Sequence, residues 1–100
     1  MEEPRCDGVV LEYYDPVQHK FRSRLIWFKA DPLLGRNQLK LALVAIKIHG
    51  LNLAAIHFIN GHATFSAAYR GPSNFEGRKM LDQYLPEDIA SEFAEYSPPD

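Results

Sequence analysis

The chain has 100 residues, of which 46% are hydrophobic and 24% charged, and its formal net charge is −2. These values describe an ordinary globular protein and argue against a disordered chain, a fibrous repeat and a strongly basic nucleic-acid binder. We therefore expect a single domain over residues 1–100, with flexible tails at residues 1–7 and 97–100.

The compartment is indicated by features that the sequence lacks. The longest apolar run, residues 41–46, is far shorter than the roughly 18 residues of a membrane-spanning helix. The acidic start, residues 1–4, has neither the basic nor the apolar segment of a secretory signal. Cys6 is the only cysteine, so no disulfide can form within the chain. We therefore expect a cytoplasmic protein with no membrane partner.

The first third of the chain predicts an antiparallel hairpin. Residues 8–14 are rich in β-branched and aromatic side chains, and the pair Asp15-Pro16 closes this run as a turn. Residues 19–29 continue with the period-two alternation of a second strand. Three cations share one face of that strand: Lys20, Arg22 and Arg24. This face is typical of solvated charge at a sheet edge, and it is also suited to binding a nucleic-acid strand.

Residues 37–49 predict a helix, which follows a loop containing the pair Asp31-Pro32. Leu and Ala dominate the segment, and both residue types favour helix. Gly50 then fits a C-terminal stop. The alternative for residues 46–48 is a short strand, because two isoleucines flank a lysine there.

The expected helix is unusually apolar around its circumference. Its cations fall within about 40° of one another on a helical wheel, and they are Arg36, Lys40 and Lys47. Apart from residues at the two ends, the rest of the surface is apolar. Such a helix is too apolar to lie on a sheet with half its surface in water. A second layer or another protein must therefore cover it.

Two β-rich runs around Asn60-Gly61 predict a second hairpin over residues 51–70. A type I′ turn needs positive φ at both central residues, which Asn-Gly provides, and Ile59 would then lie opposite His62. The core face is expected to hold Ala54, Ile56, Phe58, Phe65, Ala67 and Tyr69. The opposite face is small and polar, with Ala55, His57, His62, Thr64, Ser66 and Ala68.

The last third of the chain predicts two short helices. The spacing of Ser73 and Glu76 is that of a capping box, which opens a helix ending at Tyr84, and Pro86 suits the first turn of another. The last helix has an apolar stripe of Ile89, Ala90, Phe93 and Tyr96. The expected fold is α+β in the order ββαββα: two antiparallel hairpins joined in a four-stranded sheet, with the helices packed mainly on one face.

The polar clusters do not predict an enzyme. His57 and His62 share a hairpin face, but the hairpin supplies no third ligand for a metal ion. Thr64 and Ser66 lie on the same face, where flat strand positions provide no oxyanion hole. We therefore expect no catalytic residue, no metal ion and no cofactor.

The surfaces instead predict a protein-interaction module. Residues 1–70 carry a net charge of +3 and residues 71–100 a net charge of −5, so the last third would suit a basic partner or form a solvated helix face. The expected contacts with a partner protein are His57, His62, Thr64, Ser66, Glu87, Asp88, Glu92 and Glu95. We expect a small non-enzymatic regulator, adaptor or inhibitor, of the kind that bacteria and phages encode. A homodimer is the simplest way to cover the apolar helix.

The alternative function is nucleic-acid binding through a basic face of the sheet and the helix. Its candidate residues are Lys20, Arg22, Arg24, Arg36, Lys40 and Lys47. Affinity that depends on such contacts falls steeply with rising salt concentration, which distinguishes this function from protein binding.

Overall fold

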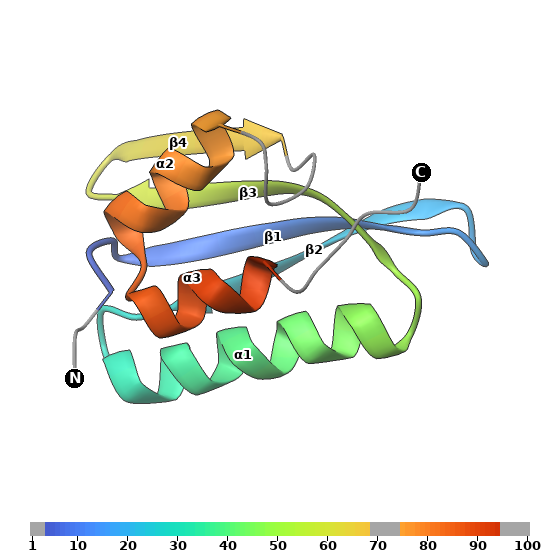
Figure 1. Ribbon diagram of the computed structural model, residues 1–100, viewed down its shortest axis with the longest axis horizontal. Coiled ribbons are helices and arrows are strands. Elements are labelled where there is room, and N and C mark those ends of the chain that lie inside the picture. The colour runs from blue at the N-terminus through green and yellow to red at the C-terminus, as the bar shows by residue number, and fades with distance from the viewer. Residues whose placement is uncertain (1–3, 69–74, 95–100) are drawn as a thin grey trace.

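Two β-hairpins and three helices make up the part of the chain that the computed structural model describes, residues 4–68 and 75–94 (Figure 1). In chain order the elements are β1 (Gly8–Asp15), β2 (Lys20–Trp27), α1 (Pro32–Ile48), β3 (Asn52–Asn60), β4 (Ala63–Ala68), α2 (Phe75–Tyr84) and α3 (Glu87–Ala94). The α+β class and the two antiparallel hairpins confirm the sequence prediction.

The four strands form one antiparallel sheet in the order β2-β1-β3-β4. β1 pairs with β2 on one side and with β3 on the other, so β2 and β3 are not neighbours. α1 therefore carries the chain from the edge strand β2 past β1 to β3. The helices lie against one face of this sheet, with α1 beside α3 and with α2 against β4 (Figure 1). None of the three described helices lies on the other face of the sheet.

The core fills the space between the sheet and the helices. Alternate residues of the central strands point into it, and Val9, Leu11 and Phe58 are fully buried. Tyr84, at the end of α2, stacks on the rings of Phe58 and Phe65, with centroid distances of 5.0 and 5.8 Å. Burial also confirms three members of the predicted stripe on the last helix, namely Ile89, Ala90 and Phe93. The fourth, Tyr96, lies outside the described residues.

α1 begins at Pro32, earlier than the predicted start at Asn37. Asp31 is the N-cap, and its Oδ1 accepts a hydrogen bond of 3.0 Å from the backbone N–H of Leu34. Proline is well tolerated in the first turn, because the N–H it lacks would have no partner there. The residues that the sequence assigned to a loop are therefore the cap and the first turn of the helix.

The end of α1 matches its prediction. The backbone N–H of Leu51 donates to the carbonyl of Ile46 at 3.0 Å, and that of Gly50 donates to the carbonyl of Lys47 at 3.3 Å. These two bonds form a Schellman motif, in which the residue after the cap is left-handed. Gly50 has a φ of 65°, which explains why glycine stands there. The alternative strand over residues 46–48 is wrong.

The turn between β3 and β4 is formed by Gly61 and His62 rather than by Asn60 and Gly61. Only Gly61 has positive φ, at 63°, as in a type II′ turn, whereas the predicted type I′ turn also needs positive φ at Asn60. The strands are therefore offset by two residues from the predicted register, and His57 lies opposite Ser66. Because the offset is even, His57, Thr64 and Ser66 keep their predicted face, whereas His62 lies in the turn. Tyr69, predicted on the core face, lies outside the described residues.

One residue of β3 departs from its predicted position. Ala54 was expected on the core face, but the register between β1 and β3 shifts at this residue, so that Glu12 pairs with Ala55 and Tyr13 with Leu53. The shift leaves Leu53 pointing into the core, where it is buried. A bulge of this kind is not visible in a two-residue periodicity.

Residues 5–7, expected to belong to a flexible tail, are hydrogen-bonded to the rest of the fold. The N–H of Arg5 donates to the carbonyl of Tyr84 at 2.7 Å, and the N–H of Asp7 donates to the carbonyl of Ile59 at 2.8 Å. The carbonyl of Asp7 accepts a hydrogen bond of 2.8 Å from the N–H of Phe28. This segment therefore joins β2, β3 and α2 at one end of the sheet.

Candidate protein-binding surface

The face of the sheet opposite the helices is a continuous surface that we call the open sheet face. By strand alternation and register it holds Gly8, Val10, Glu12 and Tyr14 of β1, Phe21, Ser23, Leu25 and Trp27 of β2, Asn52, Ala55, His57 and Ile59 of β3, and Thr64, Ser66 and Ala68 of β4. An antiparallel sheet with one face in water normally alternates between apolar core residues and polar outer residues. Among these outer residues, however, only Glu12 carries a fixed charge.

Large apolar side chains on β2 dominate one side of the open sheet face. Trp27 is 48% exposed, Leu25 is 50% exposed and Phe21 is 65% exposed. The Trp27 ring lies across Gly8 on the neighbouring strand, since a Cβ at Gly8 would lie 2.6 Å from Trp27 Cε3. The ring of Phe21 packs edge-on against that of Tyr14, with a centroid distance of 5.0 Å. The aromatic groups are therefore held against the sheet while one side of each meets solvent.

A polar group occupies the centre of the open sheet face. His57 Nδ1 lies 2.6 Å from Ser66 Oγ on β4, and His57 Nε2 lies 3.8 Å from Glu12 Oε2 on β1. The imidazole thus bridges the two strands that flank β3. A serine, a histidine and a carboxylate in line resemble the order of a nucleophilic triad, but these three lie on flat strands whose N–H groups form the sheet. Such a surface offers no cluster of donors to stabilise an oxyanion.

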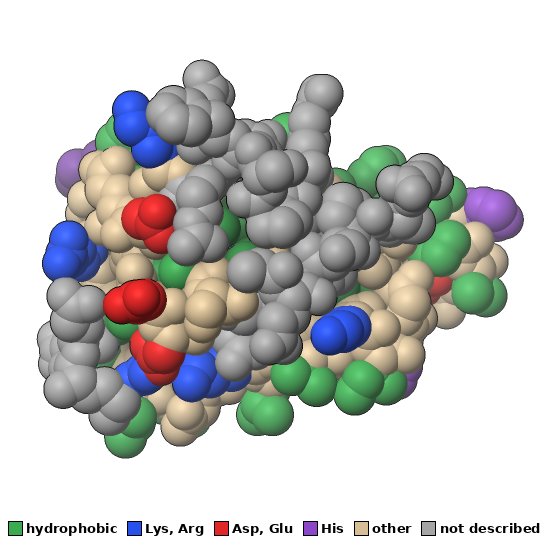
Figure 2. Space-filling view, in the orientation of Figure 1, with side chains coloured by type: hydrophobic (Ala, Val, Ile, Leu, Met, Phe, Trp, Pro, Cys, Tyr) green, Lys and Arg blue, Asp and Glu red, His purple; other side chains and the backbone are tan. Residues whose placement is uncertain are grey.

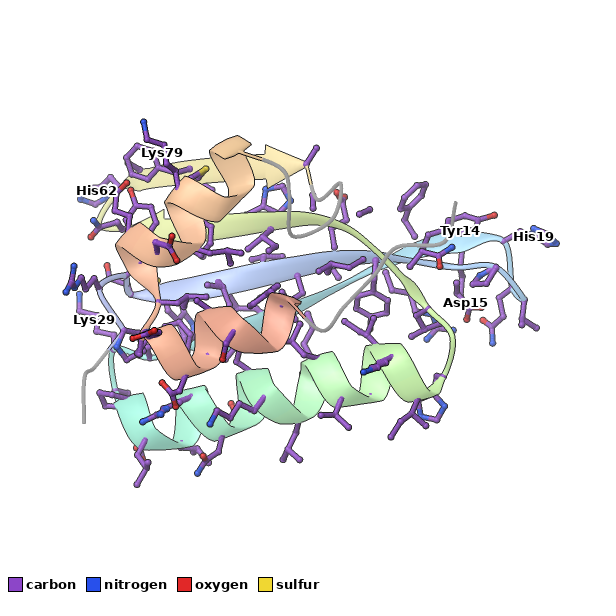
Figure 3. All side chains as sticks on the ribbon, viewed as in Figure 1. Tyr14, Asp15, His19, Lys29, His62 and Lys79 are labelled. Atoms are coloured by element: carbon purple, nitrogen blue, oxygen red, sulfur yellow. The ribbon has the colours of Figure 1, made fainter. Side chains whose placement is uncertain are left out.

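The structure brings together three of the residues expected to contact a partner. His57, Thr64 and Ser66 all lie on the open sheet face. His62 lies in the turn at the end of the β3–β4 hairpin, where it is exposed and points away from the body of the protein (Figure 3). Three of the expected acidic contacts, Glu87, Asp88 and Glu92, belong to α3, on the other side of the sheet. The side chain of Glu92 and the whole of Glu95 lie outside what the structure describes.

Asp88, one of the expected partner contacts, is instead a counter-ion within the fold. It lies at the start of α3 and forms an ion pair with Arg36 on α1, whose side chain is buried. Lys40 Nζ lies 3.2 Å from the same carboxylate. The neighbouring Glu87 is exposed in the first turn of α3. Asp88 therefore connects two helices although its side chain is partly exposed.

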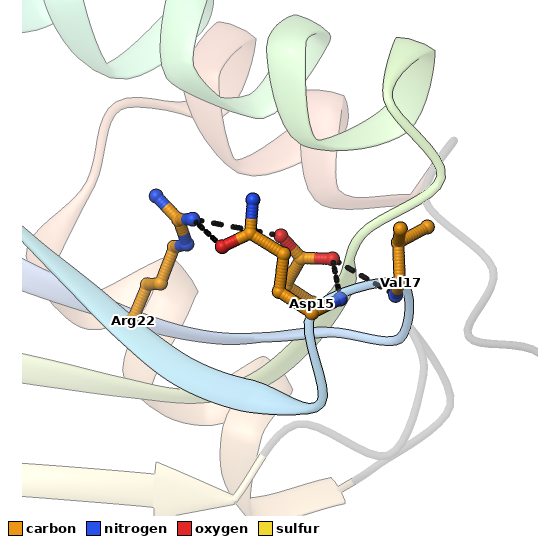
Figure 4. A network of polar contacts seen from close by, with 4 residues as sticks. Asp15, Val17 and Arg22 are labelled. Atoms are coloured by element: carbon orange, nitrogen blue, oxygen red, sulfur yellow. Dashed lines mark hydrogen bonds and ion pairs between the residues drawn. The ribbon is translucent and has the colours of Figure 1, made fainter.

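The six cations expected to bind nucleic acid fall into two groups on different elements. Lys20, Arg22 and Arg24 share one face of β2, as predicted, but this face is the one on the helix side of the sheet. At the tip of that hairpin, Arg22 Nη2 donates to Gln18 Oε1 at 2.5 Å and lies 3.7 Å from Asp15 Oδ2 (Figure 4). The second group lies on α1 and consists of Arg36, Lys40 and Lys47. Two of its members converge on Asp88.

A shallow pocket lies on the helix side of the sheet, between the first hairpin and the end of α1. Its volume is about 160 Å³, close to that of a cavity that holds one small aromatic molecule. The lining is mostly apolar, with Leu11, Tyr13, Arg24, Ala42, Ala45, Ile46, His49 and Leu51. It is separated from the open sheet face by the sheet itself and does not extend that surface.

Sequence reasoning missed the apolar half of the open sheet face. The missed apolar residues are Val10, Phe21, Leu25, Trp27 and Ile59, and Glu12 was missed with them. Sequence analysis expected the face of β2 that carries the cations to lie in solvent. The sequence does not correct this, because Ile26 and Phe28 share the face of the cations while Leu25 and Trp27 are equally apolar on the other, and only the structure shows that Ile26 and Phe28 are buried.

Comparison of the chain with protein-family models, with curated protein sequences and with solved structures found no match. Within residues 4–68 and 75–94, no three histidine, cysteine or acidic side chains are grouped closely enough to hold a metal ion. None of the helices that the structure describes is both long and apolar enough to cross a membrane.

Proposed function

We propose that this chain is a small non-enzymatic protein-interaction module that binds a partner protein through the open sheet face. Two observations together support the proposal. The open sheet face exposes three large apolar side chains of β2, and among its residues only Glu12 carries a fixed charge. Depletion of charge and enrichment of aromatic residues distinguish the centre of a protein interface from ordinary surface. Binding of this kind makes the chain a regulator, adaptor or inhibitor of its partner.

The chemistry of the surface indicates what the partner presents. Trp27 and Leu25 offer area for an apolar side chain, and aromatic anchors of this type often carry most of the binding energy of an interface. The contact of Glu12 with His57 is long, at 3.8 Å, so this carboxylate needs a further hydrogen-bond donor once water is removed, because a buried charge without good hydrogen bonds is costly. The proposed partner therefore carries an apolar patch that contains a basic or hydrogen-bond-donating residue.

Two further features support a non-enzymatic role in the cytoplasm. The polar centre of the open sheet face lies on a flat surface rather than in a cleft, and catalytic groups usually lie in concave sites. The one cysteine is a free, buried thiol, as is common in a reducing compartment. Neither feature depends on the identity of the partner.

The proposal is tested with a partner recovered from the source cells by affinity purification, identified by mass spectrometry and then purified. Binding is measured for the wild type, for Trp27→Ser and for Leu25→Ser. We expect each substitution to weaken binding about tenfold or more, the loss typical of an interface anchor. Val17→Ser is the control, because Val17 is an exposed aliphatic residue in the turn between β1 and β2, outside the open sheet face. Unchanged affinity of both open-face variants would refute the proposal.

The same variants distinguish protein binding from nucleic-acid binding. A partner held by the open sheet face should be insensitive to alanine at Lys20, Arg22 and Arg24, which lie on the other side of the sheet. A nucleic acid bound by those cations should be released as salt rises and should ignore Trp27→Ser. Retention of an oligonucleotide at low salt, lost on removing the cations, would therefore favour the alternative function.

A further inference from the structure

The helix α1 turns its charged side toward the body of the protein. The guanidinium of Arg36 is buried against Asp88, and Lys40 Nζ approaches the same carboxylate to 3.2 Å. These charges lie beside the core-facing residues of α1, such as Leu39 and Leu43, which are buried. A surface helix normally points its charged residues at water and its apolar ones at the core. In α1 the residues farthest from the core are apolar with the exception of Asn37, and the exposed Lys47 lies at the margin of this surface.

Five apolar side chains form this outward surface, which we call the α1 stripe: Leu33, Leu34, Leu41, Val44 and Ile48. Their exposed fractions range from 45% for Val44 to 73% for Ile48. Leu34, Leu41 and Ile48 are spaced by seven residues, and Val44 follows Leu41 by three, which is the spacing of a helix–helix seam. Hydrophobic side chains follow the lower edge of the protein, where α1 runs (Figure 2).

We propose that the α1 stripe binds a second copy of this chain, as an antiparallel pair of α1 helices about a two-fold axis near Leu41. Leu34 and Ile48 lie seven residues to either side of Leu41, so reversing one copy places Leu41 against Leu41 and Leu34 against Ile48 of the second copy. The exposed Asn37 lies on the same helix face and would meet the region around Ala45 of the second copy. The antiparallel direction also brings the opposite ends of the two helix dipoles together.

The area of the α1 stripe is sufficient for a second copy but small for a permanent complex. Covering five aliphatic side chains on each of two copies gives an interface on the order of 1,000 Å², near the lower limit for specific association. The stripe contains no charged side chain that would select a different partner by electrostatic complementarity. We therefore expect a reversible homodimer whose dissociation constant is in the micromolar range, roughly 1–100 μM.

This dimer is independent of the proposed binding function, because the α1 stripe and the open sheet face lie on opposite sides of the protein.

Sedimentation velocity of the full chain over a wide concentration range measures the association. We expect the wild type and Trp27→Ser to form dimers, and Leu41→Lys to remain monomeric with an unchanged circular dichroism spectrum. A wild type that is monomeric throughout, or a Leu41→Lys variant that dimerises normally, would overturn the proposal. Loss of the dimer in Trp27→Ser alone would also overturn it.

The orientation is tested by cysteine cross-linking with a short bifunctional maleimide. Leu41→Cys places two thiols near the axis and should give a covalent dimer in high yield. Leu34→Cys is the matched control, because antiparallel packing about Leu41 separates its two copies by roughly 20 Å along the helix axis, beyond the reach of the reagent. The native Cys6 is buried and should not react. Equally efficient cross-linking through Leu34→Cys would indicate a parallel pair and contradict the proposal.

Discussion

Asp88 illustrates how a single side chain can be misjudged from sequence. Two acids at the start of α3 have the same favourable interaction with the helix dipole, and sequence offers no means of distinguishing them. Only the packing of α3 against α1 brings Asp88 to Arg36 and leaves Glu87 in solvent. The two acids therefore provide a matched pair for mutation.

Asp88→Asn should destabilise the fold, because it leaves the buried Arg36 guanidinium without a counter-ion. We expect a loss of about 1–3 kcal/mol, since Asp88 itself is partly exposed, and Glu87→Gln should cost less than about 0.5 kcal/mol. Urea denaturation followed by circular dichroism measures the free energy of unfolding of both variants. Equal effects of the two substitutions would show that the interaction with the helix dipole, rather than the ion pair, provides the stabilisation.

Cys6 is the second residue whose environment has a measurable consequence. Burial raises the pKa of its thiol to about 12, and the nearby Asp7 carboxylate acts in the same direction, against an opposing hydrogen bond from the backbone at Gly8. The folded protein should therefore resist alkylation by iodoacetamide at about pH 8, where the unfolded chain reacts. Rapid labelling of the native protein, followed by mass spectrometry, would contradict this assignment.

The same pKa has a defined effect on stability. In the unfolded chain the thiol ionises near its ordinary value of 9.0, whereas in the folded protein it stays protonated to about pH 12. The contribution of Cys6 is therefore fully present below about pH 9 and declines as the pH rises toward 12. Replacing Cys6 with Ala should remove this part of the alkaline destabilisation, which urea titrations at several pH values would measure.

At the scale of elements, Gly35 shows why α1 is positioned as it is. A Cβ at this position would lie 2.2 Å from the backbone oxygen of Trp27 and 2.7 Å from Phe28 Cδ1. Glycine therefore permits the first turns of α1 to approach the end of β2 closely. Sequence reasoning did not find this requirement, because glycine in a helix is ordinarily unfavourable.

Gly35→Ala should destabilise the protein, although alanine is the better helix former. The gain in helix propensity is about 1 kcal/mol, and the clash with the backbone of β2 should exceed it, giving a net loss of about 1–3 kcal/mol. Gln38→Ala on the same helix is the control and should change stability by only a few tenths of a kcal/mol. Thermal unfolding measures the stability of both variants. A stabilised Gly35→Ala variant would show that α1 does not pack against the backbone of β2 as closely as described.

The boundaries of most elements were predictable, because hydrophobic period and turn residues act locally. The start of α1 was missed because an Asp-Pro pair suits both a loop and an N-cap, and only the hydrogen bond to Leu34 distinguishes the two. The register of β4 was missed because the sequence Asn60-Gly61 also fits a two-residue type I′ turn, one residue earlier than the turn actually formed by Gly61 and His62. In both places the local signal was compatible with two geometries.

At the scale of the whole molecule, the strand order and the covered face of the sheet could not be predicted. Residues 25–28 place apolar side chains on both faces of β2, so the two-residue period does not determine which face of the strand meets the helices. The position of the helices decides it, and places the cations of β2 on the helix side and Trp27 on the open sheet face. The candidate site was thus half predictable: His57, Thr64 and Ser66 were found, and the apolar half contributed by β2 was not.

The two apolar surfaces give the whole molecule two separate means of association. The apolar character of α1 was predictable from its composition, and the part of the chain that the structure describes leaves its outer apolar side chains exposed. The open sheet face instead results from the arrangement of the sheet and the helices. A dimer formed through α1 would present two open sheet faces, and each would remain available to a partner.

The central claim, that the open sheet face is the partner-binding surface, is tested most directly by fluorescence quenching of Trp27. Trp27 is the only tryptophan of the chain and lies on that face, so its emission reports on this surface when the partner's own tryptophans are replaced by phenylalanine. Acrylamide should quench Trp27 readily in the free protein, at concentrations below and above those at which the chain dimerises. Saturation with the partner should shift the emission to shorter wavelength and protect it from the quencher. Emission that stays equally quenchable in the saturated complex would contradict the claim.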